Sequence, residues 1–186
     1  MKIGLLPVGQ VNHSFLSIIC RHLTNIFSGS TCTVITEGFA LSEKAFDQKR
    51  SQYDSSFILS QIQQYADQQG TFERVLGVVD VDLYVPELNY VFGEAYTPGK
   101  AALISLFRLK PEFYGQPADE KLFFDRALKE AVHELGHTLG LGHCLNPNCI
   151  MHFSNSITDT DKKQTLFCKQ CMIQKEVATK NKGRKP

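Results

Sequence analysis

The sequence predicts a single α/β domain in which helices pack on a mixed, twisted β-sheet. Runs of apolar residues that suit buried strands alternate with segments whose apolar residues recur at the helical period of 3.6. Two apolar runs near the middle of the chain are separated by a short turn sequence, which indicates an antiparallel pair within the sheet. The length of 186 residues suits one domain with its own core better than two.

The first part of the chain alternates strands and helices. In chain order we expect a strand, a helix, a strand and a helix over residues 2–7, 15–27, 31–36 and 55–68. Pro7 ends the first strand, and Gly70 marks the end of the second helix. The polar residues 45–54 are expected to form a surface connection.

The middle of the chain is expected to supply the centre and one edge of the sheet. Residues 74–81 are almost continuously apolar, as in a central strand covered on both faces. Residues 89–95 and 101–109 are separated by the turn sequence that begins at Tyr96, so these two strands are expected to form an antiparallel hairpin. A helix is then expected from residues 122–132 onwards.

The most informative stretch of the chain is residues 131–144, which read AVHELGHTLGLGHC. His133 and His137 lie four residues apart on the predicted helix, so both imidazoles can reach a single metal ion. Gly140 follows where the helix should stop, because glycine adopts positive φ there without steric cost. The chain can then turn back and bring in His143 as a third nitrogen ligand.

This arrangement of histidines predicts a catalytic zinc site. Three neutral imidazoles leave one tetrahedral position open for water. Glu134 has no obvious place among the ligands, so we expect it to be the general base that accepts a proton from the zinc-bound water and passes it to a leaving amine. A helix that merely carries solvated histidines is the alternative, and the fixed spacing of Gly140 and His143 argues against it.

Four cysteines form a second candidate metal site. Cys144 and Cys149 flank a tight polar loop. Cys168 and Cys171 are expected near the end of a helix that begins at Thr158. Two closely spaced pairs in a reduced compartment are typical of a closed, structural four-thiolate zinc site. A thioredoxin-like redox pair is the alternative for the second pair, but that motif belongs at the start of a helix that follows a strand, and it leaves the first pair unexplained.

The pattern His-Glu-x-x-His-x-x-Gly-x-x-His over residues 133–143 resembles the metzincin zinc proteases, and Met151 resembles the methionine of their Met-turn. The cysteine directly after the third histidine, together with Cys168-x-x-Cys171, is similar to the archaemetzincins. The resemblance is sharp over residues 131–171. It implies a metzincin-like catalytic fold, an apolar floor of methionine beneath the metal, a peptide or protein substrate, and two Zn²⁺ per chain, one catalytic and one structural.

The resemblance also implies a domain organisation. Residues 1–171 would form one catalytic domain, with an upper part over residues 1–142 and a short, zinc-clipped lower part over residues 143–171. The antiparallel edge strand at residues 89–95 is then the candidate for pairing with an extended peptide, because an unpaired strand edge offers donors and acceptors to a peptide backbone. An edge merely covered by a loop is the alternative.

For several residues an ordinary structural role is the alternative interpretation. Met151 could be an ordinary core methionine, and His152 could be a cleft residue, a spare ligand or an exposed side chain. Cys20 and Cys32 are expected to be buried thiols.

The chain departs from other metzincins in its brief segment after His143 and in lacking a tyrosine soon after Met151. The alternative function is a catalytically weak zinc-binding interaction module, and endopeptidase and aminopeptidase action are both left open.

Composition and charge indicate the expected location and partners of the protein. The formal net charge is +1, and no nucleic-acid surface is expected. Residues 172–186 carry five basic residues against one acidic residue and are expected to form a flexible tail, with contact to RNA or an acidic partner as the alternative. Neither a membrane span nor a signal peptide is recognised. We therefore expect a cytoplasmic protein, favour a monomer, and expect its cysteines to be reduced.

Overall fold

A five-stranded mixed sheet forms the centre of the protein, with strand order β2-β1-β5-β8-β7. The computed structural model describes residues 1–181, with side chains through Val177. Four strands run parallel: β1 (Lys2–Pro7), β2 (Thr31–Val34), β5 (Arg74–Val79) and β8 (Ala101–Ser105). The edge strand β7 (Gly93–Ala95) pairs antiparallel with β8, so the predicted hairpin is confirmed, with an edge strand that begins at Gly93 and not at Asn89.

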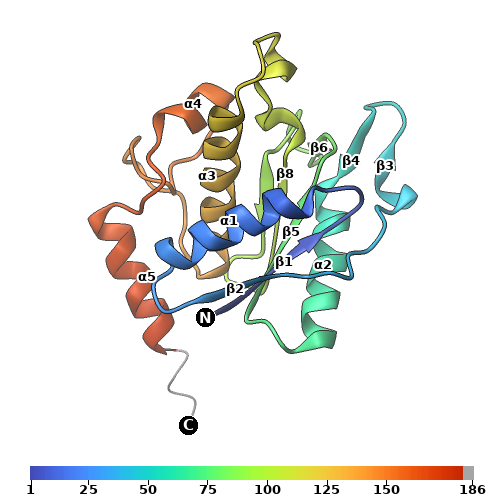
Figure 1. The fold of residues 1–186 in the computed structure, drawn as a ribbon. Coiled ribbons are helices and arrows are strands. Elements are labelled where there is room, and N and C mark those ends of the chain that lie inside the picture. Colours follow the sequence, from blue (N-terminus) through green and yellow to red (C-terminus); the bar gives the residue numbers. More distant parts are fainter. Residues whose placement is uncertain (182–186) are drawn as a thin grey trace.

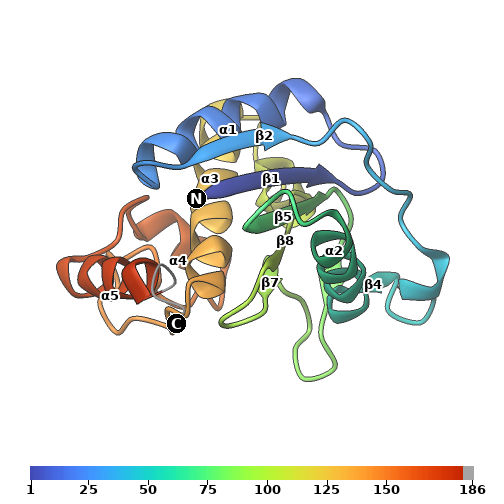
Figure 2. The ribbon, with the colours of Figure 1, turned by 90° about the horizontal axis from the view of Figure 1, so that it is seen from below.

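Helices cover both faces of this sheet (Figures 1 and 2). Helices α1 (His13–Ile26) and α3 (Glu120–Thr138) pack on one face, and α2 (Ser55–Gln69) packs on the other. Side chains of the strands alternate between the two cores: on β5, Leu76 and Val78 face α1 and α3, while their neighbours in the strand face α2. The predicted α/β fold, a mixed sheet with packed helices, is confirmed.

Polar caps define where these helices begin and end. The Asn12 side chain accepts hydrogen bonds from Ser14 N and Phe15 N at the start of α1. Asp54 accepts from the backbone N–H of Phe57, at 3.1 Å, at the start of α2. Gly70 ends α2 in the left-handed region at φ 61°. The helices predicted from apolar periodicity and from Gly70 agree with these bounds to within about two residues.

The region that was expected to be a surface connection contains strands instead. The short 3-10 helix η1 (Glu43–Ala45) leads into β3 (Phe46–Asp47) and β4 (Gln52–Asp54), which form a second sheet with β6 (Leu83–Tyr84). The prediction was wrong because this pairing depends on backbone hydrogen bonds to a distant segment, such as Tyr53 N to Asp82 O at 2.8 Å. The polar side chains of these strands give no apolar pattern.

Two 3-10 helices shorten the predicted last strand. β8 ends at Ser105, and η2 (Phe107–Leu109) and η3 (Pro111–Tyr114) follow it. Arg108 of η2 pairs with Asp82, and Lys110, which lies between the two helices, pairs with Asp80; both aspartates follow β5. These ion pairs hold the connection against the sheet before α3 begins.

The C-terminal segment forms two helices where one was expected. α4 (Ile157–Lys162) is separated by residues 163–168 from α5 (Lys169–Asn181). The capping box lies at Ser156 and Asp159, two residues before the predicted one. The motif Cys168-x-x-Cys171 therefore stands at the start of a helix and not at the end of one.

The predicted basic tail begins inside α5. Its helical part reaches Asn181, and residues 182–186 lie outside the described residues, so the flexibility of the tail stays a prediction. Across residues 1–181, no helix combines the length and apolar character needed to cross a membrane. The division into upper and lower parts also stays a prediction.

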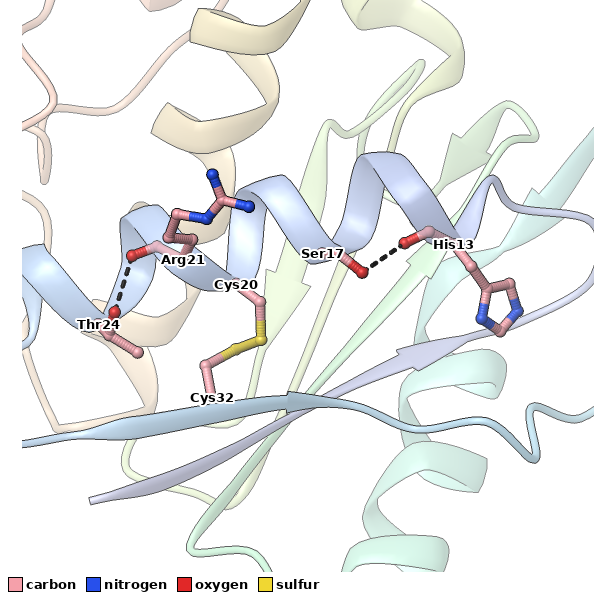
Figure 3. The surroundings of a disulfide bond; sticks show 6 residues. All are labelled: His13, Ser17, Cys20, Arg21, Thr24 and Cys32. Carbon is pink, nitrogen blue, oxygen red and sulfur yellow. Dashed lines mark hydrogen bonds between the residues drawn. A yellow bond between two sulfur atoms is a disulfide. The ribbon is translucent and has the colours of Figure 1, made fainter.

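A disulfide joins α1 to β2, which corrects the prediction for Cys20 and Cys32 (Figure 3). These residues were expected to be free buried thiols. Helix α1 packs directly along β2 and brings the two Cα atoms to 5.3 Å, within the range that a disulfide spans. Periodicity places each cysteine in its own element but does not say which helix face meets which strand. The remaining cysteines are free.

Candidate active site

Helix α3 presents the first two histidines of the site. Asp119 caps the helix, with its carboxylate accepting from Leu122 N at 2.9 Å. After Thr138 the chain turns sharply: Gly140 has φ +92°, a conformation that favours glycine, and Leu141 N donates back to Gly136 O at 3.2 Å. This turn returns the chain toward the helix, as the glycine pattern predicted.

The structure brings His133, His137 and His143 together. One ring nitrogen from each histidine can be chosen so that all three lie within 4.8 Å of one another. The Nε2 atoms of His133 and His137 are 3.1 Å apart. His133 is buried, His137 is half-buried and His143 is exposed, with its ring 4.9 Å from that of Phe153. The three side chains that the sequence selected therefore form one cluster.

Hydrogen bonds to backbone carbonyls hold the first two imidazole rings in the tautomer that can bind a metal ion. Nδ1 of His133 lies 2.8 Å from Ile150 O, and Nδ1 of His137 lies 2.8 Å from Leu141 O. Because a carbonyl only accepts, Nδ1 carries the proton in each ring and Nε2 keeps its lone pair. Two such lone pairs at 3.1 Å repel each other unless a cation lies between them. The donor set therefore suits Zn²⁺.

Burial keeps these histidines neutral. Desolvation is the main cause that lowers the pKa of His133 well below its ordinary value, and it also lowers the pKa of His137 and His143. The positive charge of Lys163 acts in the same direction on all three rings. Neutral imidazole is the form that binds a metal.

Glu134 is a buried carboxylate beside this cluster. It is 5% exposed and lies against the backbone of the edge strand: a Cβ added to Gly93 would be 2.7 Å from Glu134 Cγ. Burial, followed by the negative charge of Glu130, raises the pKa of Glu134 well above its ordinary value. Gly93 is thus the residue that allows the carboxylate to approach β7 so closely.

A cleft of about 600 Å³ runs across the histidines and Glu134. The edge strand and the loop before it form one wall, and the segment after Met151 forms part of the other. Tyr90 crosses between the walls, with its hydroxyl donating to Asn155 O at 3.0 Å. The edge strand predicted for peptide pairing therefore borders the histidine cluster.

Met151 lies beneath the histidine helix. It is fully buried, and a Cβ added to Gly136 would overlap its sulfur. A tight turn holds it there, with His152 N donating to Cys149 O at 2.9 Å and Cys144 N donating to Met151 O at 2.8 Å. His152 turns its Nδ1 to the Cys144 carbonyl at 2.8 Å and belongs to neither metal-ligand cluster of the described residues.

The four cysteines also come together. Each offers a sulfur atom within 4.8 Å of the other three, and Cys144 Sγ lies 3.8 Å from Cys168 Sγ. A hydrogen bond from the backbone of Cys171 is the main cause that lowers the pKa of Cys168 to about 7, while burial raises the pKa of Cys149 and Cys171. One objection to a redox pair falls only in part, since the second pair does start a helix but the element before it is α4 and not a strand. The other holds, because all four sulfur atoms share one site.

Comparison with known proteins agrees with this geometry. The model of peptidase family M54 matches residues 31–176. An archaemetzincin of Pyrococcus abyssi is 43% identical over 171 residues, covering 90% of each chain. The chain belongs to peptidase family M54, the archaemetzincins.

Solved structures of this family share the fold. A zinc-dependent peptidase from Methanocorpusculum labreanum is 31% identical, with a TM-score of 0.84 over 93% of this chain and 99% of that one. An archaemetzincin from Archaeoglobus fulgidus, solved in complex with malonate, is 38% identical, with a TM-score of 0.80 over 94% of this chain and 99% of that one. The M54 protein described here is therefore a metallopeptidase with the archaemetzincin fold, as the sequence predicted.

The M54 site contains a buried ion pair that the sequence analysis missed. Lys163 Nζ lies 3.2 Å from Glu130 Oε1, and both side chains are almost completely buried beside the cleft. Thr160 donates to the same carboxylate oxygen at 3.0 Å. The only signal available was the position of Glu130, one turn before Glu134 on the same helix face. Its partner lies 33 residues later, where nothing in the local pattern marks it.

Proposed function

We propose that this metallopeptidase hydrolyses peptide bonds in the cleft beside β7, with a catalytic zinc ion held by His133, His137 and His143. The observation that carries the proposal is the convergence of three imidazoles beside the buried carboxylate of Glu134, in a cavity of about 600 Å³. A zinc ion held there would supply positive charge that polarises a peptide carbonyl and makes water more acidic. All other steps depend on the side chains of the chain itself.

The two carbonyl hydrogen bonds orient the imidazoles before a metal arrives. Because Ile150 O and Leu141 O fix the Nδ1–H form of His133 and His137, neither ring has to change tautomer or rotate to present Nε2. His143 reaches the same position from the turn after α3. The cluster is therefore largely pre-organised for metal binding, which reduces the conformational cost of ligation.

Glu134 is the proposed proton carrier. A carboxyl group whose pKa is raised by burial is a stronger base than an exposed one, and can return the proton as an acid at the same pH. It would accept a proton from the attacking water and donate it to the nitrogen of the leaving amine. Its contact with Gly93 holds it against β7, where a bound peptide would lie.

The edge strand is the proposed binding site for the substrate backbone. Within residues 1–181, β7 is bonded on one side to β8 and has no strand on its other side. An extended peptide can add to that free side through main-chain hydrogen bonds, which bring its carbonyl groups past the histidines. This mode predicts weak dependence on sequence, because the affinity comes from the peptide backbone.

The four cysteines are the proposed ligands of a structural zinc ion. Four thiolates close the coordination sphere and leave no position for a reactant. The site ties the start of α5 to the turn that carries His143, since Cys144 is the next residue. Together with the histidine site, this gives two zinc ions per chain.

We also propose a cytoplasmic monomer that acts on peptides or proteins. The four free thiols gathered at one site suit a reducing compartment. The disulfide between Cys20 and Cys32 is the observation that counts against this location, because such bonds are uncommon in the cytosol. The redox state of that pair in protein taken directly from cells therefore tests the proposed compartment.

Zinc content per chain tests the proposed sites first. We expect two zinc ions in the wild type and one in the His133→Ala, His137→Ala double variant. One zinc ion in both proteins would mean that the histidines do not hold metal, and would favour the alternative of a zinc-binding interaction module.

Turnover tests the chemistry. On a mixed peptide library we expect cleavage that a zinc-ligating hydroxamate stops. Replacing the general base should reduce kcat by about 10²–10⁴-fold, so we expect Glu134→Gln to lose turnover while keeping two zinc ions. Undiminished cleavage by Glu134→Gln would rule out the proposed role of this residue.

A further inference from the structure

A second cavity lies behind the C-terminal end of the active-site helix. It encloses about 400 Å³ between the ends of α1 and α3, the start of β5 and helix α5. Its apolar wall includes Ile26, Phe27, Leu139 and Met172. None of its lining residues lines the histidine cleft, so it is a separate site.

Arg74 is the unusual residue in this cavity. Its side chain lines the cavity although the residue is only 3% exposed. Nε donates to Thr138 Oγ1 at 3.0 Å, and Nη1 donates to the backbone carbonyl of Glu73 at 2.5 Å. Both acceptors are neutral. Within residues 1–181, the guanidinium forms no ion pair, and Nη2 has no acceptor.

A buried guanidinium without a carboxylate partner is costly. Removing such a charge from water is offset in most proteins by an opposite charge at hydrogen-bond distance. The C-terminal end of α3 supplies only a partial negative charge near Thr138. Desolvation lowers the pKa of Arg74, and the negative charge of Glu73 opposes that shift only in part.

A second orphaned polar group lines the same cavity. Ser30 Oγ is buried and has no hydrogen-bond partner. Arg74 Nη2 also has no acceptor among the described residues but is not a buried atom, so a ligand or ordered water can reach it.

We propose that this cavity binds a small organic monocarboxylate, with its carboxylate on Arg74 and its apolar body against Phe27 and Leu139. The volume of about 400 Å³ lies within the range of ligand pockets. Glu73 and Glu176 also line the cavity. Lys175 lines it too, so the lining beside Arg74 carries mixed charge, and the ligand that we propose carries a single negative charge. The proposal does not depend on zinc or on peptidase activity.

Phenylacetate and its neutral isostere phenylacetamide are suitable probes. We would measure binding to the zinc-loaded protein by isothermal titration calorimetry, at constant ionic strength. We expect saturable binding of phenylacetate, and binding of phenylacetamide that is about tenfold weaker or undetectable, because only the carboxylate forms charge-assisted hydrogen bonds. Equal binding of the two probes, or no saturable binding of phenylacetate, would overturn the proposal.

A carboxylate can also bind to a zinc ion, so the same titration is repeated on the His133→Ala, His137→Ala double variant. If phenylacetate binds the double variant as tightly as it binds the wild type, the measured heat of binding comes from a site other than the histidine cluster. Loss of binding in that variant would place the carboxylate in the cleft and overturn the proposal. This second titration tests the cavity proposal separately from the proposed function, because neither outcome requires an active enzyme.

Variants of the cavity locate the site. We expect Arg74→Met to weaken binding about tenfold or more, and Arg74→Lys, which keeps the charge, to weaken it less. If Arg74→Met does not fold, Ser30→Phe serves in its place, because the added ring would occupy the cavity and block the probe. Lys100→Met is the control, since this exposed lysine pairs with Asp67 outside the cavity. Binding that survives both Arg74→Met and Ser30→Phe would contradict the proposed site.

Discussion

Met151 occupies the space that any side chain at position 136 would need. A Cβ built on Gly136 overlaps Met151 Sδ and lies 3.3 Å from a ring carbon of Phe167. Gly136 stands between His133 and His137 along the chain and turns toward the floor of the site. The absence of a side chain there lets the methionine turn approach the helix that carries two of the three histidines.

Gly136→Ala should therefore damage the metal site. Overpacking of a dense core costs about 1–3 kcal/mol, and the displaced atoms lie directly below the histidines. We expect the free energy of unfolding to fall by about that amount, and zinc affinity at the histidines to fall about tenfold or more. Gly142→Ala is the matched control, because a Cβ there meets nothing within 4 Å. Equal zinc affinity in both variants would contradict this role of Gly136.

Gly93→Ala should separate catalysis from metal binding. The added Cβ would lie 2.8 Å from Glu134 Oε1 and 2.6 Å from Leu103 O, so either the carboxylate or the edge strand must move. Small misplacements of a reacting group can reduce turnover about 10²-fold. We expect kcat to fall at least tenfold while both zinc ions are retained. Unchanged kcat would mean that the proposed base does not need its place beside β7.

The sequence predicted those parts of the molecule that local spacing determines. The histidines at i and i+4, the glycine that reverses the chain and the clustered cysteines all follow from distances of a few residues. Strands β1, β5 and β8 were predictable because their burial on both faces makes them almost continuously apolar.

Features that depend on long-range pairing were not predictable from spacing. The disulfide between Cys20 and Cys32 requires knowing that α1 packs along β2. Strand β4 depends on pairing with residues about 30 positions away, and β3 in turn pairs with β4. The burial of Lys163 could not be predicted from the sequence, because lysine usually lies on the surface. Its buried position depends on Glu130, a partner that is distant in the chain.

Lys163→Met should destabilise the fold through the partner that it leaves behind. Lys163 is completely buried and Glu130 is 4% exposed, so removing the ammonium leaves a buried, unpaired carboxylate. Breaking such a pair costs about 3–5 kcal/mol. Urea unfolding should show this loss, with Lys162→Met, whose ammonium is exposed, within about 0.5 kcal/mol of wild type.

The double variant Glu130→Gln, Lys163→Met separates the charge from the shape of this pair. The neutral amide has no charge to bury, so we expect most of the lost stability to return. If the double variant is as unstable as Lys163→Met, the lost stability does not come from the unpaired charge of Glu130.

The pH dependence of stability should report on the buried carboxyl of Glu134. Burial and the charge of Glu130 raise its pKa well above the ordinary 4.5. When the histidine site holds no metal, the folded protein therefore keeps a proton above pH 4.5 that the unfolded chain releases. Folding then takes up a proton, so this group reduces stability progressively as pH rises from 4.5 to the raised pKa.

Glu134→Gln removes that dependence, because an amide does not titrate. In protein dialysed to one zinc ion per chain, we expect the variant to be more stable than wild type at pH 8, and the two to converge as pH approaches 4.5. Urea unfolding at intervals between pH 5 and 8 measures the difference, in which the lowered pKa values of the histidines largely cancel. With both zinc ions bound the difference should shrink, since a nearby cation favours the carboxylate. A difference that is constant with pH would mean that Glu134 is ionised in the metal-free fold.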